Sequence, residues 1–119
     1  MVGVRFLTIA LLMACGPAAA QDGAAAFQTY CGACHSVEKP ARNRLGPSLV
    51  GVVGRKAGSA PDYSYSAAMK AYGQAWTPAN LDRFLAAPAQ ALPGTKMGFV
   101  GVKDAAKRAN VIAFLKMQR

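Results

Sequence analysis

Five consecutive residues, Cys31-Gly32-Ala33-Cys34-His35, combine two thiols with the single histidine of the chain. On a helix, side chains three positions apart lie on one face. Both sulfurs can then form thioethers with the two vinyl groups of one haem, while the imidazole of His35 binds the iron. Because C-x-x-C-H is the attachment pattern of a c-type haem, we expect covalent anchoring and one axial ligand within this pentad.

Three other kinds of site use similar residues, and the sequence supports them less well. A structural zinc site needs four Cys or His ligands, usually in two separated pairs, whereas Cys15 is the one cysteine outside the pentad. A thioredoxin-like redox motif needs a βαβ context, which the Ala-rich stretch before the pentad and the Pro-containing loop after it do not supply. A simple disulfide leaves His35 without a role.

The iron of an electron carrier usually has a second protein ligand, commonly Met, Lys or a second His. No second His exists, and Met69, Met97 and Met117 follow the N-terminal segment. Met97 lies in the polar, glycine-containing loop Pro93-Gly94-Thr95-Lys96-Met97-Gly98-Phe99, where a methionine is not needed to fill a core. The sequence therefore favours Met97, and a His/Met pair raises the reduction potential of haem iron.

The first twenty residues have the pattern of a secretory signal peptide. Arg5 precedes an apolar run over residues 6–15, and Ala18-Ala19-Ala20 is a small-residue cleavage site. The apolar run is shorter than a bilayer-spanning helix. We expect residues 1–20 to be removed, residues 21–119 to form one domain, and the protein to be periplasmic in a bacterium. Lipid anchoring at Cys15, in a lipobox-like segment, and an uncleaved membrane anchor are the weaker alternatives.

The net charge of +9, from 14 Lys and Arg against 5 Asp and Glu, favours acidic partners. Nucleic acid is disfavoured, because an exported protein rarely meets it and no stripe of interleaved aromatic and basic residues is present. A domain of this size has a modest core. A haem would enlarge that core, so we expect the protein without haem to be poorly folded.

The elements that must position these residues are helices joined by loops rich in Gly and Pro. We expect helices over residues 22–34, 65–72, 78–87 and 103–118, loops over 36–61 and 89–101, and no strand. Thr77 and Pro78 form a helix start, and Pro88 is the stop of that helix. The side chains expected to face inward from the last two helices are Leu81, Phe84, Leu85, Val111, Ile112, Phe114 and Leu115.

With these motifs in place, the chain resembles the small monohaem class I cytochromes c over nearly all of residues 22–119. Gly46-Pro47 matches the family loop whose proline carbonyl accepts a hydrogen bond from the ligand imidazole. Residues 93–97 match the methionine-ligand loop, and Phe99 matches the phenylalanine at the haem edge. The resemblance implies one covalent haem c held by four residues: Cys31, Cys34, His35 and Met97.

The resemblance also implies an all-α cytochrome c fold, with about three to five helices and long loops wrapped round the haem. The N- and C-terminal helices should cross, with Gly23 and Phe27 against Val111 and Phe114. The haem propionates should be met by residues that match family positions: Gly54, Arg55, Lys56, Tyr63, Tyr65 and Trp76.

Departures from the family pattern concern the haem pocket and the surface. Phe84 replaces a tyrosine whose hydroxyl bonds the methionine sulfur in many relatives, and Met69 replaces an asparagine. Both changes should remove a polar network near Met97 and so alter the reduction potential. Ala89 and Gln90 stand where mitochondrial relatives carry lysines. The remaining candidates for a basic docking face are Lys39, Arg44, Lys96, Lys103 and Lys107.

The function that the resemblance implies is a monomeric, periplasmic one-electron carrier rather than an enzyme. Its partners would be redox proteins with acidic docking surfaces, in transient contact. These are a quinol-oxidising cytochrome complex, a terminal oxidase, a peroxidase, a photosynthetic reaction centre or a dehydrogenase. One alternative is a dedicated cytochrome subunit of a periplasmic dehydrogenase complex. Another is a gas sensor or peroxidase-like enzyme, which requires that Met97 does not hold the iron.

Overall fold

The structure is a computed structural model that describes Gly3 and residues 18–119, with side chains described from Asp22 onward. The predicted signal peptide and the Cys15 lipobox therefore lie largely outside the described residues. The described part contains α1 (Ala18–Tyr30), α2 (Ala67–Tyr72), α3 (Pro78–Ala86), α4 (Pro88–Ala91) and α5 (Ala105–Lys116). It has no strand beyond one isolated bridge between Lys56 and Ala75. The all-α prediction is confirmed.

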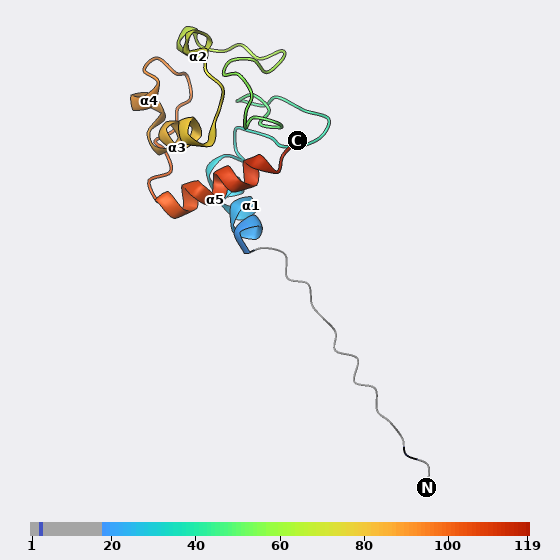
Figure 1. The fold of residues 1–119 in the computed structure, drawn as a ribbon. Coiled ribbons are helices and arrows are strands. Elements are labelled where there is room, and N and C mark those ends of the chain that lie inside the picture. The colour runs from blue at the N-terminus through green and yellow to red at the C-terminus, as the bar shows by residue number, and fades with distance from the viewer. Residues whose placement is uncertain (1–2, 4–17) are drawn as a thin grey trace.

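Helices α1 and α5 cross at one end of the domain, as predicted (Figure 1). A Cβ atom at Gly23 would lie 2.6 Å from the carbonyl oxygen of Asn110 and 2.8 Å from the Cβ of Phe114. Only glycine permits this backbone approach. Beside it, the rings of Phe27 and Phe114 pack with centroids 5.2 Å apart, and Phe27 and Val111 are almost fully buried.

The first helix ends at Tyr30, so the prediction that it continues to residue 34 is wrong. The carbonyl of Phe27 accepts both the Cys31 amide, at 2.7 Å, and the Gly32 amide, at 2.9 Å. The Cys31 carbonyl likewise accepts the amides of Cys34 and His35, at 3.1 and 2.9 Å. Shared carbonyls replace the regular helical ladder, and Gly32 weakens the helix further. The pentad therefore lies on two tight turns after α1.

Local capping explains the boundaries of α2 and α3. The Ser66 hydroxyl accepts the Met69 amide at the start of α2, and Gly73 ends that helix in the left-handed conformation. At the start of α3, the Thr77 hydroxyl accepts the Asn80 amide at 3.1 Å, with Pro78 in the first turn. The capping prediction at Thr77 and Pro78 is confirmed, as is a short helix before Gly73.

Pro88 ends α3 and also begins α4, a short helix where the sequence predicted loop from residue 89. Proline favours the first position of a helix for two reasons. Its fixed φ suits a helix, and its missing N–H is one that would have no partner within the helix. The last helix is shorter than predicted at both ends. Its N-cap is Asp104, whose carboxylate accepts the Lys107 amide at 3.0 Å.

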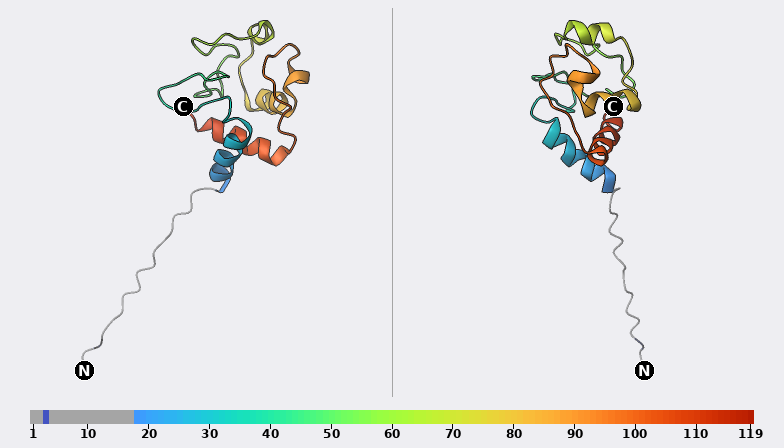
Figure 2. Two further views of the ribbon diagram at one scale, coloured as in Figure 1. Left: turned by 180° about the vertical axis from the view of Figure 1, so that it is seen from behind. Right: turned by 90° about the vertical axis from the view of Figure 1, so that its left-hand side faces the viewer.

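The long segment between α1 and α2 forms one side of the molecule, and α3, α4 and the loop after them form the other, with α1 and α5 below (Figure 2). The C-terminal end is tied to the long segment, because the Gly51 amide donates to the Gln118 carbonyl at 2.5 Å. Inward-facing residues of α3 and α5 are as predicted: Leu81, Phe84, Leu85, Val111, Ile112 and Leu115 are buried, and Phe114 is partly buried. None of the helices in the described part is long and apolar enough to cross a membrane.

Candidate haem site

A cavity of about 270 Å³ lies between the two sides of the molecule. The pentad and the Met97 loop, which are distant in sequence, both line it. Most of the residues predicted to hold or meet haem lie on its wall: Cys31, Cys34, His35, Pro47, Arg55, Tyr63, Tyr65, Trp76, Met97 and Phe99. Gly54 and Lys56, which were also expected at the propionates, do not line it. Most of the remaining wall is apolar, with Leu49, Val52, Leu81, Phe84, Leu85 and Leu115.

The two cysteines differ in exposure although they belong to the same turns. Cys31 is buried and Cys34 is exposed, and both are free thiols. Burial, with a smaller effect from Cys34, raises the pKa of the Cys31 thiol to about 11. The disulfide alternative is therefore not the state that the structure describes.

The orientation of His35 is fixed by the loop that follows it. Its Nδ1 lies 2.8 Å from the carbonyl oxygen of Pro47, and because a carbonyl only accepts, Nδ1 must donate. Burial lowers the pKa of His35, with the Pro47 bond opposing this in part. A neutral imidazole with Nδ1 protonated has its lone pair on Nε2, which is the state that binds a metal.

Gly46 lets the loop press against the imidazole ring. A Cβ atom here would lie 2.3 Å from Cε1, 2.7 Å from Nδ1 and 2.9 Å from Nε2 of His35. The Gly46 amide also donates to the Cys34 carbonyl at 2.7 Å. The pentad and the Gly46-Pro47 loop thus form one rigid support for the ring.

Of the three candidate methionines, Met69 and Met97 line the cavity and Met117 does not. Met97 lies in the loop between α4 and α5, whereas Met69 lies in α2. Phe84 is buried on the same wall and packs against Trp76, with ring centroids 5.0 Å apart. The tyrosine-to-phenylalanine departure therefore places an apolar ring in the pocket.

The polar residues of the wall also brace the surrounding loops. Arg55 donates to the carbonyls of Ser48 and Val50, each at 3.0 Å, and burial lowers its pKa although it stays charged at neutral pH. The Tyr65 hydroxyl accepts the Ala60 amide at 3.0 Å, which leaves its own hydrogen available to donate. The ring of Trp76 is buried on the cavity wall, and its indole N–H, which makes no hydrogen bond to a described residue, is not itself enclosed by protein.

Three of the five predicted docking cations contact backbone carbonyls. Arg44 donates to Gly32 at 2.8 Å, and Lys103 donates to Ala86 at 2.7 Å. Lys96 donates to Ser64 and lies over the ring of Tyr63, 4.6 Å from its centroid. Lys39 and Lys107 are exposed.

Sequence reasoning missed Asn43, which braces the loop that holds His35. Its side-chain oxygen accepts the Ser48 amide at 2.9 Å, and its nitrogen donates to the Pro61 carbonyl at 2.9 Å. Asn is common in turns because its side chain bonds nearby backbone. That signal was available from the sequence, but the partner at Pro61 depends on the fold.

The site fits a covalently bound haem. Two sulfurs on adjacent turns, an oriented imidazole and a thioether surround one largely apolar cavity. Gly46 has no Cβ because the His35 ring fills that space. The described residues contain no group of three or more His, Cys, Asp or Glu that could hold a bare metal ion.

Comparison with known proteins gives consistent matches. The family model described as Cytochrome c matches residues 20–118. The chain is 48% identical over 99 residues to a cytochrome c homolog of Bradyrhizobium diazoefficiens, covering 82% of the chain and 53% of that relative. It is 46% identical over 96 residues to cytochrome c2 of Agrobacterium tumefaciens, covering 78% and 86%. The solved structure of cytochrome cH from Methylobacterium extorquens superposes with a TM-score of 0.76 at 46% identity, covering 82% and 96%. The chain thus spans about half of the Bradyrhizobium relative but most of the other two.

Proposed function

The chain belongs to the cytochrome c family, and we propose that it is a one-electron carrier with haem c bound through Cys31 and Cys34. The observation that carries the proposal is the single cavity that brings both cysteines together with His35 and Met97. When bound, the haem supplies an iron that alternates between the ferric and ferrous states.

The protein contributes two axial ligands in this proposal. His35 offers Nε2, because Nδ1 is occupied by the Pro47 carbonyl, and this bond raises the basicity of the ring. Met97 offers a thioether, which favours ferrous iron. If His35 and Met97 both held the iron, no side of it would be open to a substrate, and the protein would act as a carrier and not as an enzyme.

Three residues are assigned to the propionate end of the haem. The indole N–H of Trp76 needs a partner in a buried setting, and a propionate oxygen supplies one. Tyr65 can donate its hydroxyl hydrogen, and the guanidinium of Arg55 adds a positive charge. Together they would neutralise carboxylates that are costly to bury alone.

The proposed location is the periplasm, and the proposed partners are redox proteins with acidic docking surfaces. The net charge is +9 for the whole chain and falls to +8 when Arg5 is removed with residues 1–20, and it supports transient, charge-steered contact by a monomer. The partner classes remain those expected from the sequence, namely membrane complexes that oxidise quinol or reduce oxygen, reaction centres, peroxidases and dehydrogenases. No role in nucleic-acid binding is proposed.

A dedicated subunit of a dehydrogenase complex is the second candidate. Leu45 and Val100 favour it, because these large apolar side chains are 79% and 81% exposed. Co-purification with a large partner at high salt would select this candidate over the free carrier.

Spectra of the exported holoprotein test the proposal, with Met97→Ala compared against Met69→Ala. We expect the wild type to show a c-type spectrum, a near-infrared sulfur-to-iron band in the ferric form, and no change with carbon monoxide. Met97→Ala should lose the band and bind carbon monoxide, whereas Met69→Ala should keep the band. If the wild type lacks the band and binds carbon monoxide, the carrier proposal is wrong and a gas sensor or peroxidase-like enzyme is favoured instead.

A further inference from the structure

The loop that carries Met97 is fastened at its base, where it returns from the cavity to α5. The Val102 amide donates to the Leu85 carbonyl at 2.7 Å, at the end of α3. Lys103 donates to the next carbonyl, that of Ala86, at 2.7 Å. Gly101 lies so close that a Cβ atom would be 2.3 Å from the Ala86 oxygen. The returning end of the loop therefore lies against the last turn of α3.

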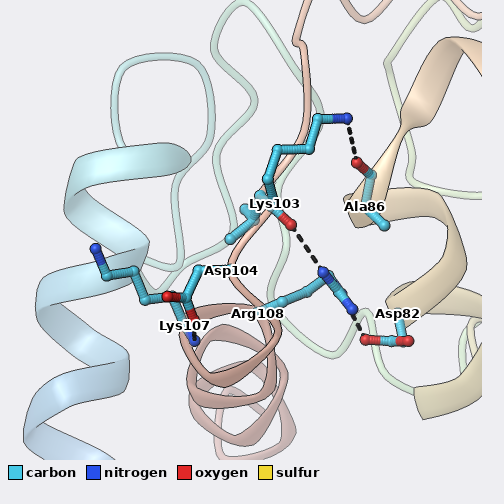
Figure 3. A network of polar contacts seen from close by, with 7 residues as sticks. Asp82, Ala86, Lys103, Asp104, Lys107 and Arg108 are labelled. Carbon is cyan, nitrogen blue, oxygen red and sulfur yellow. Dashed lines mark hydrogen bonds and ion pairs between the residues drawn. The ribbon is translucent and has the colours of Figure 1, made fainter.

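One side chain joins this base to both flanking helices (Figure 3). Arg108, in α5, donates from Nη1 to the Val102 carbonyl at 2.9 Å. Its Nε lies 2.6 Å from Oδ1 of Asp82, in α3. The Arg108 side chain is only 13% exposed, so its charge needs a compensating partner. Asp82 supplies it through a charge-assisted hydrogen bond.

The other acidic group near Arg108 is Asp104, which attracts the guanidinium but makes no hydrogen bond to it. The carboxylate of Asp104 accepts the Lys107 amide and so caps α5. The ammonium of Lys103 is directed to the Ala86 carbonyl (Figure 3). Of the two ion pairs among the described residues, the other joins Glu38 to Arg42 within one exposed loop, at 3.6 Å.

We propose that the Asp82–Arg108 pair is a latch that holds the Met97 loop closed over the cavity. The carboxylate of Asp82 fixes the guanidinium in the orientation that also holds the Val102 carbonyl. Without Asp82, Arg108 can rotate away, the returning end of the loop loosens, and the Met97 thioether leaves the iron more often. Asp82 and Arg108 are positioning residues, and the inference rests on the proposed ligation by Met97.

The test uses the ferric holoprotein and imidazole, which binds the iron only when the Met97 thioether has left. At saturating imidazole, the binding rate is set by that departure. We expect Asp82→Ala to raise this rate about twofold to fivefold, as the loss of one partly exposed charge pair predicts. Glu38→Ala changes the net charge equally and breaks the exposed loop pair, so its rate should match the wild type.

A second measurement separates a latch from a general structural role. If Asp82→Ala lowers the free energy of unfolding in urea but leaves the imidazole rate unchanged, the pair only joins α3 to α5 and the latch is wrong. A wild type without the near-infrared sulfur-to-iron band overturns the Met97 ligation and the latch together. A wild type with the band and an unchanged Asp82→Ala rate overturns the latch alone.

Discussion

At the scale of single residues, the tightest constraint on the site is the contact between Gly46 and the His35 ring. A methyl group at residue 46 would overlap three ring atoms, at 2.3 to 2.9 Å. We expect Gly46→Ala to displace either the ring or the loop and to lengthen the bond to Pro47. The free energy of unfolding of the holoprotein in urea should fall by about 1–3 kcal/mol, as overpacking usually costs.

Gly98 provides the matched control for this substitution. It also lines the cavity, and a Cβ atom there meets no protein atom within 4 Å. Gly98→Ala should therefore cost less than Gly46→Ala, because no protein atom has to move to accept the methyl group. Equal losses for both variants would show that the Gly46 contact is not what constrains the ring.

The pentad could be singled out because its chemistry is local in sequence. The Gly46-Pro47 loop and Trp76 were expected only from the family resemblance, and residues of all three segments line the cavity. The engagement of Lys96 with Ser64 was not predictable, since the two are 32 residues apart and meet only in the folded chain. A lysine has the same appearance in a sequence whether its ammonium is solvated or bonded.

At the scale of elements, the crossing of α1 and α5 depends on a glycine that is unfavourable for a helix. Alanine is a better helix former than glycine by about 1 kcal/mol. At residue 23, however, the methyl group of an alanine would lie 2.6 Å from the Asn110 carbonyl oxygen. This oxygen belongs to the backbone of α5, so it can move away only if the helix moves. We expect the steric cost to win, so that Gly23→Ala lowers the unfolding free energy by about 1–2 kcal/mol net. An increase measured in urea would show that the helices separate without penalty.

The start of α5 should make a pH-dependent contribution to stability. The hydrogen bond from the Lys107 amide, helped by the Ala106 amide and nearby cations, lowers the pKa of Asp104 in the folded protein. A carboxylate whose pKa is lower in the folded than in the unfolded state stabilises the fold fully at pH values above its unfolded-state pKa. This stabilisation is lost as the pH falls through the folded-state pKa. Asp104→Asn keeps a capping side chain but cannot titrate. In urea titrations over a pH series, the wild type should exceed Asp104→Asn in stability above about pH 4, and the two should converge in acid.

Element boundaries were less predictable than element types. The periodicity gave four helices correctly in kind, but the first was predicted to continue through the pentad. It ends at Tyr30 because the Phe27 carbonyl accepts two amides, a choice that apolar spacing does not encode. The short helix α4 was missed because Pro88 was interpreted only as a stop, although a proline also favours a helix start.

At the scale of the whole molecule, the cavity occupies the place of a core. Inward-facing residues of α3 and α5, including Leu81, Leu85 and Leu115, belong to the buried core cluster and also lie on the cavity wall. The contact between α1 and α5 is the main helix–helix packing in the described part that does not depend on this wall. A small domain has little other apolar area with which to offset the entropy of ordering the chain.

We therefore expect removal of the haem to unfold most of the domain. A group that binds only the folded state stabilises it, and a covalent one cannot dissociate. Chemical cleavage of both thioethers should reduce the far-ultraviolet helical signal by about two fifths, because α2, α3 and α4 hold 19 of the 44 helical residues in the described part. Helices α2 and α3 would lose the cavity wall that they share, and α4 packs on α3. Residual helix should come from α1 and α5, which contact each other directly through Phe27 and Phe114. Gly23→Ala should then reduce that remainder further, whereas an apoprotein that keeps its full helical signal would show that the cavity walls pack together without the haem.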